Sequence, residues 1–150
     1  MSQRVRSQPY IARDIVLRAS SGNLTAEDIS TVVASQGFEK AIVALHVEAL
    51  VMADADDEVD FYIQTRLDGD WVDVANVHFA NGDEPIATAE RLIKIGPMAT
   101  GVASLTPTDA TLADNTDVDL PVGDAIRIKC EVTGATAPTY AYSATVSLYG

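Results

Sequence analysis

Apolar and polar side chains alternate along most of this chain. In residues 41–51 the apolar side chains fall at every second position, which is the period of a β-strand with one buried face. We expect the inward positions of this strand to be Val43, Leu45, Val47, Ala49 and Val51, with Ala44, His46 and Glu48 on the other face.

Residues 59–67 repeat the pattern and predict a second strand. Its expected inward positions are Val59, Phe61, Ile63, Thr65 and Leu67, and its outward positions are Asp60, Tyr62, Gln64 and Arg66. The Asp68–Gly69 pair that follows is typical of a two-residue hairpin turn. Residues 71–79 then form the next expected strand, which begins at the chain's only tryptophan, Trp71.

Further alternation predicts strands over residues 11–19, 89–95, 125–132 and 140–149, and weakly over residues 25–34. Turn-forming residues separate these segments, and no segment has the period of an amphipathic helix. The pattern therefore predicts an all-β fold, an antiparallel jelly-roll-like β-sandwich formed by residues 11–150.

Two segments lack the alternation. Residues 1–10 are polar and are expected to form an extended N-terminal arm. Residues 97–122 form a loop that is long for a compact domain, and such loops are usually functional or disordered.

The charge is divided unequally along the chain. The net charge is −12, which argues against nonspecific binding to nucleic acid. Four arginines and one aspartate nevertheless give residues 1–18 a balance of +3, so the remaining 132 residues carry −15. A short basic segment therefore precedes an acidic body.

Other sequence features bear on the cellular compartment and on disulfide or zinc binding. No apolar run is long enough to span a bilayer, and the first residues do not resemble a signal peptide, so we expect synthesis in a cytoplasm and no membrane contact. The single cysteine, Cys130, excludes an intramolecular disulfide, and no Cys/His spacing resembles a zinc site.

Five carboxylates crowd residues 54–60. Four of them, Asp54, Asp56, Glu58 and Asp60, have the spacing of the first ligands in an EF-hand loop, although the required glycine and distal glutamate are missing. A looser calcium site could recruit Asp114, Asp117 and Asp119 from the long loop. The simpler interpretation is a solvated loop tip, because surface carboxylates need no partner in water.

Catalysis is the least expected class of function. Carboxylates in loops stay ionised and suit general acid chemistry poorly. There is no nucleophile elbow, and Cys130 falls on the inward face of its strand. His46 and His78 are interpreted as surface histidines, with a shared metal site as the alternative. We therefore expect no cofactor and no enzyme.

Two hairpin segments carry a resemblance to a known group of proteins. The first, residues 37–79, runs through VDFYIQTRLDGDWVDVANVHF, and the second, residues 125–150, ends in VTGATAPTYAYSATVSLYG. Their order is similar to that in small β-sandwich proteins encoded among the head genes of tailed bacteriophages. These resemble capsid decoration, or cement, proteins. Residues 97–122 depart from the group, which usually has a short crossing there.

The resemblance implies a non-enzymatic virion protein on the capsid exterior. Such a protein would bind the major capsid protein and bridge neighbouring capsid subunits, commonly as a homotrimer. The segments expected to reach the partner are the arm and the long loop, through Arg4, Arg6, Tyr10, Arg13, Leu105 and Leu112. Two alternatives stay open, a carbohydrate-binding module on a virion surface and a tail-associated structural protein that forms rings.

Overall fold

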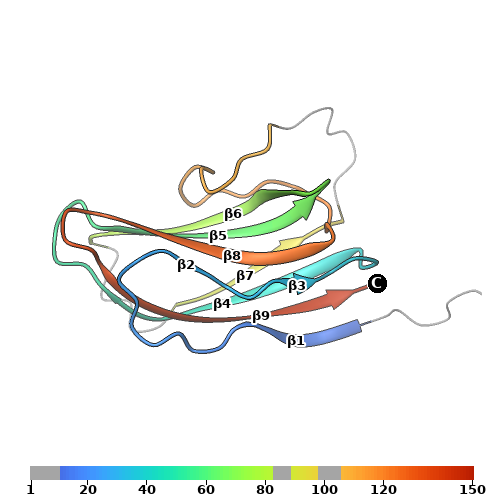
Figure 1. Ribbon diagram of the computed structural model, residues 1–150, viewed down its shortest axis with the longest axis horizontal. Coiled ribbons are helices and arrows are strands. Elements are labelled where there is room, and N and C mark those ends of the chain that lie inside the picture. The colour runs from blue at the N-terminus through green and yellow to red at the C-terminus, as the bar shows by residue number, and fades with distance from the viewer. Residues whose placement is uncertain (1–10, 83–88, 98–105) are drawn as a thin grey trace, which may run out of the picture.

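The computed structural model of this protein describes residues 11–82, 89–97 and 106–150, which form two antiparallel β-sheets packed face to face (Figure 1). None of these residues is helical, so no helix capable of crossing a membrane is found among them. The strands are β1 (Ile11–Arg18), β2 (Asp28–Ile29), β3 (Val33–Ala34), β4 (Lys40–Val51), β5 (Glu58–Leu67), β6 (Asp70–Ala80), β7 (Ala89–Ile95), β8 (Ala125–Thr133) and β9 (Thr139–Tyr149). The expected all-β sandwich is confirmed. The arm, residues 1–10, lies outside the described part and stays a prediction.

The strands pair in a nested order. One sheet has the order β1-β9-β4-β7, and the other has β2-β8-β5-β6 with β3 also paired to β8. The first strand therefore pairs with the last, β2 and β3 with β8, β4 with β7, and β5 with β6. The first half of the chain therefore pairs with the second half in reverse order, and the paired strands are divided between the two sheets.

The core lies between the two sheets and contains most of the inward residues expected from the alternation, among them Val43, Leu45, Val47, Val59, Phe61 and Ile63. Phe61 is completely buried and meets the rings of Phe79, Tyr140 and Tyr142 edge to face, at centroid distances of 5.4 to 6.1 Å. Such pairs add about 0.5–1.5 kcal/mol each beyond the burial of apolar area. This aromatic cluster joins the two layers, because Phe61 and Phe79 come from one sheet and the tyrosines from the other.

The hairpin turn between β5 and β6 follows the expectation. Asp68 and Gly69 both have positive φ angles, 53° and 84°, as a two-residue turn of this kind requires. Glycine adopts this conformation without steric cost, and aspartate tolerates it better than most residues.

The expected alternation of β4 is wrong after Val47, because the strand contains a β-bulge there. The pairing of β4 with β9 shifts between Val47 and Ala49, so the alternation changes phase after that point. Leu50 is buried instead, and Val51, expected to face inward, is 61% exposed.

A second bulge shapes β6. Ile63 pairs with Ala75 and Gln64 pairs with Asp73, which leaves Val74 as the extra residue. Val74 and Ala75 are both buried in the core. The bulge therefore places Asp73 on the same outward face as Asn76 and His78, three and five residues further on.

The end of the long loop covers the outside of this second sheet. Figure 1 shows the described part of the segment beyond β6, on the side away from the first sheet. Its backbone bonds to the outer edge of β6: the amides of Asp73 and Asn76 donate to the carbonyls of Thr108 and Thr116, at 2.8 and 3.0 Å, and the Val118 amide donates to the Val74 carbonyl at 2.8 Å. Only Ala75 and Asp117 form a bridge of the β type. The segment thus protects a sheet edge without regular pairing, which explains its lack of alternation.

Candidate functional site

Six polar side chains line the outward face of β5 and β6, and we call them the polar row. The register pairs Gln64 with Asp73, Tyr62 with Asn76 and Asp60 with His78. Gln64, Asp73 and Asn76 are at most 2% exposed, and Tyr62 and Asp60 are also buried. The expectation that Asp60, Tyr62 and Gln64 face solvent is therefore wrong, because residues 108–118 lie over them.

The carboxylate of Asp73 anchors that covering segment. Its Oδ1 accepts hydrogen bonds from Gln64 Nε2 and the Ala110 amide, and its Oδ2 accepts from Thr108 Oγ1 and from the amides of Thr111 and Leu112, all at 2.8 to 3.1 Å. A buried charge is tolerated only when it is paired or fully hydrogen-bonded. Five donors meet that need here, so the carboxylate organises the backbone of residues 108–112 around itself.

Gln64 continues the network toward Trp71. Its Nε2 also donates to Asp109 Oδ1 at 2.8 Å, and its Oε1 accepts from Arg127 Nε at 2.8 Å. The Arg127 guanidinium lies 4.2 Å from the centroid of the Trp71 ring. Burial lowers the pKa of Arg127, although nearby carboxylates oppose that effect. Trp71 lines a groove of about 440 Å³ together with Leu67, Asp70, Val72, Pro107, Thr108, Asp109 and Leu120.

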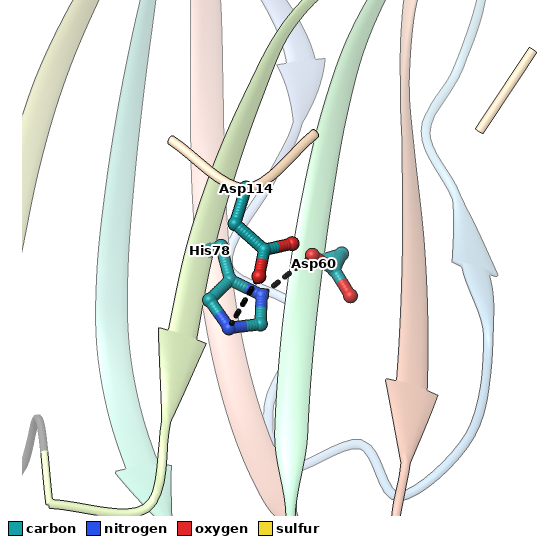
Figure 2. A group of neighbouring side chains, drawn as sticks. All are labelled: Asp60, His78 and Asp114. Atoms are coloured by element: carbon teal, nitrogen blue, oxygen red, sulfur yellow. Dashed lines mark hydrogen bonds and ion pairs between the residues drawn. The ribbon is translucent and has the colours of Figure 1, made fainter. Parts of the chain in front are cut away.

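The other end of the polar row holds a histidine between carboxylates. Figure 2 shows His78 from β6, Asp60 from β5 and Asp114 from the covering segment converging on one point. His78 Nδ1 lies 2.7 Å from Asp60 Oδ1, and Nε2 lies 3.4 Å from Asp114 Oδ2 and 3.9 Å from Glu58 Oε1. The imidazole is 9% exposed.

The charges of this cluster act on its titratable groups. Burial by itself lowers the pKa of His78, but the hydrogen bond and charge of Asp60, together with the charges of Asp114 and Glu58, leave it raised. Burial, followed by the charge of Asp60, raises the pKa of Tyr62 and keeps the phenol neutral. The cluster therefore holds a fixed imidazole in an anionic setting, which suits a cation.

The acidic run of residues 54–60 is divided by the structure. Asp54, Asp56 and Asp57 gather at the loop between β4 and β5, whereas Glu58 and Asp60 lie on β5 beside His78. Asp57 is completely buried, and its Oδ2 accepts hydrogen bonds from the amides of Ala53 and Asp54 at 2.9 and 3.1 Å. The proposed set Asp54, Asp56, Glu58 and Asp60 is thus not brought together as four ligands. Asp57 stabilises the turn through these hydrogen bonds, whereas Asp114 does lie close to Asp60.

The residues expected to reach a partner are placed only in part. Arg4, Arg6, Tyr10 and Leu105 lie outside the described residues. Arg13 is exposed on β1, and Leu112 is half-buried, with its backbone bonded to Asp73 and Asn76. Their role in binding stays a prediction.

Two candidate residues from the sequence, Cys130 and His46, lie away from the polar row. Cys130 is completely buried in the core, and burial raises the pKa of its thiol, which opposes reactivity. His46 lies outward on β4, in the other sheet from His78, so the two histidines do not share a site.

Alternation alone could not reveal the polar row, because burial of the outward face depends on a segment about 40 residues away. One signal was available: Asp60, Gln64, Asn76 and His78 are hydrogen-bonding side chains at alternate positions of two adjacent strands, and Asp73 joins them only through the bulge at Val74. No protein-family model matches the sequence, and no curated protein is significantly similar to it. What the protein does is therefore inferred from its own residues and from the resemblance of its hairpins.

The Asp73→Asn variant should lose stability. An amide in this position turns one acceptor into a donor that faces backbone N–H groups, and we expect a loss of about 2–4 kcal/mol in the free energy of unfolding. Urea denaturation followed by circular dichroism measures this loss. Asp117→Asn, an exposed aspartate of the same segment, is the matched control and should change stability by no more than about 0.5 kcal/mol. Equal stabilities for the two variants would contradict the anchoring role of Asp73.

Proposed function

We propose that this protein is a non-enzymatic virion structural protein that binds the outside of a phage capsid and bridges neighbouring capsid subunits. The two hairpins that carry the resemblance form β4 to β6 and β8 to β9, of which β4, β5, β8 and β9 are central strands of the two sheets and β6 is an edge strand. The nested pairing of the strands is also the order of a jelly roll, the fold that the resemblance implies. Both features support the proposal.

The observation that carries the proposal is the contrast between the outer faces of the two sheets. The outward residues in the middle of β5, Asp60, Tyr62 and Gln64, are buried under residues 108–118. In the four-stranded sheet the outward residues in the middle of β4 and β9, including Ala44 and Thr145, are half-exposed. Figure 1 shows β1, β9 and β4 along the opposite side of the molecule from the covering segment.

The uncovered face combines small central residues with apolar side chains at its two edges. The register aligns Val16 of β1, Thr145 of β9, Ala44 of β4 and Leu92 of β7 in one row across the sheet. Val16 is 56% exposed and Leu92 is 69% exposed. A groove of about 380 Å³ runs along the β1 side of this row. We call this surface the apolar face after that row, although the groove is also lined by Arg18, His46, Glu90 and Ser143, and we assign the surface to the capsid.

In sequence, the basic arm directly precedes a strand of the apolar face. Residues 1–10 lead directly into β1, the edge strand of this sheet, where Arg13 is exposed. An arm that orders on binding extends the area of contact, and its arginines would pair with acidic patches on the capsid lattice. We propose that copies of the protein associate as a trimer at local threefold positions, since bridging needs contact with more than one capsid subunit.

Charged substitutions on the apolar face should weaken binding. We expect the Val16→Asp, Leu92→Glu double variant to bind at least about tenfold more weakly, because central apolar contacts dominate most interfaces. Cosedimentation with empty heads of the phage that encodes the protein measures occupancy. Val32→Asp is the control, since Val32 is 52% exposed and lies between β2 and β3 of the other sheet. Undiminished binding of the double variant, or an equal loss with the control, would count against this face.

Removal of residues 1–10 should weaken capsid binding without changing the stability of the β-sandwich. The truncated chain retains β1 and the whole core, so its thermal melt should stay within a few degrees of the full chain. Occupancy on empty heads should fall by at least about tenfold if the arm supplies the electrostatic contacts, and the binding of the full chain should weaken as salt rises. Full occupancy by the truncated chain would contradict the role of the arm.

A further inference from the structure

The imidazole of His78 is oriented by a carboxylate, as the imidazoles of metal-binding histidines commonly are. The buried carboxylate of Asp60 lies 2.7 Å from Nδ1, which places the proton of a neutral ring on Nδ1 and the lone pair on Nε2. Metal-bound histidines almost always give their second ring N–H to a carboxylate, a carbonyl or a water. The lone pair of Nε2 is therefore free for an ion, and the carboxylates of Asp114 and Glu58 lie near that atom.

The distances on the Nε2 side fit a small divalent ion. Metal–nitrogen and metal–oxygen bonds of about 2.0–2.1 Å in a tetrahedron separate two ligand atoms by about 3.3–3.4 Å. Nε2 of His78 and Oδ2 of Asp114 are 3.4 Å apart. Glu58 Oε1 lies 3.9 Å from Nε2 on a side chain that is 42% exposed, and it stands outside the group of Asp60, His78 and Asp114, whose ligand atoms lie within 4.8 Å of one another.

A second observation points to the same place. Asn76 is 2% exposed, and its Nδ2 donates to the Asp60 oxygen that also holds His78. Among the described residues its Oδ1 has no hydrogen-bond partner, although the atom is buried. Buried acceptors are rarely left without a partner, and the side chain that carries this one also bonds to Asp60, so the water that a bound ion carries would be a partner for it.

We propose that His78 and Asp114 bind one divalent transition-metal ion, with Zn²⁺ as the best match, that Glu58 turns toward this ion as a third ligand, and that Asp60 orients the imidazole. An imidazole with carboxylates suits Zn²⁺ or Mn²⁺, whereas Ca²⁺ and Mg²⁺ take oxygen ligands. Three protein ligands leave a fourth position for water.

The ion would join two parts of the chain that are distant in sequence. Glu58 and His78 belong to the β5–β6 hairpin, and Asp114 belongs to the covering segment. The His78 amide also donates to Asn115 Oδ1 at 3.0 Å, so the ion would add to an existing attachment. This is a second attachment point, at the opposite end of the polar row from Asp73, and it does not depend on the proposed capsid function.

The test uses the full chain after removal of metal with EDTA and dialysis. Isothermal titration with Zn²⁺ should show one site, and Zn²⁺ should raise the melting temperature, because a ligand that binds only the folded state stabilises it. Mg²⁺ and Ca²⁺ at the same concentration should have no comparable effect. Loss of all response to Zn²⁺, Mn²⁺ and Co²⁺, or an equal response to Ca²⁺, would overturn the proposal.

Matched variants locate the ion. We expect His78→Gln and Asp114→Asn each to weaken Zn²⁺ binding at least tenfold, and Asp60→Asn to weaken it about 10- to 100-fold. His46→Gln and Asp117→Asn replace the same residue types elsewhere and should bind as the parent does. Asp114 is 62% exposed, so its variant should fold even if that of His78 does not. Unchanged affinity in Asp114→Asn would place any bound ion elsewhere and overturn the proposal.

Discussion

The attachment of residues 108–112 to the buried carboxylate of Asp73 is the constraint on which the rest of the structure depends. This carboxylate lies on a strand whose outer edge and outward face would otherwise meet water. By accepting three backbone amides and two side-chain donors, it turns an irregular segment into a cover for the second sheet. The cover buries the middle of one outer face of the sandwich, whereas the outward residues in the middle of the other face stay half-exposed.

The sequence predicted the strands because their alternation is long and their turns carry the expected residues, as at Asp68 and Gly69. The errors occur where pairing, and not composition, determines the direction of a side chain. Val51 points outward because a bulge after Val47 changes the phase of β4. The extra residue Val74 likewise brings Asp73 into line with Asn76 and His78. Bulges have no strong signal in a single sequence, so neither displacement could be predicted from local pattern.

The candidate site was predicted less well, for a related reason. Acidic residues 54–60 attract attention as a run, but the fold separates the turn residue Asp57 from Glu58 and Asp60 on β5. The meeting of Asp60 with Asp114 was raised only as an alternative, as part of a calcium site. The histidine between them was interpreted as a surface residue, and it is 91% buried because a segment from far along the chain covers it. Such a contact depends on tertiary structure, which alternation does not encode.

The central claim of this account is that residues 108–118 belong to the folded body and do not require a partner to become ordered. Amide hydrogen exchange of the isolated full chain tests it most directly. The amides of Ala110, Thr111, Leu112 and Val118, which donate to Asp73 and to Val74, should exchange slowly, with protection that approaches that of β6. Exchange of these four amides at the rate of an unstructured peptide, while β5 and β8 stay protected, would contradict the claim.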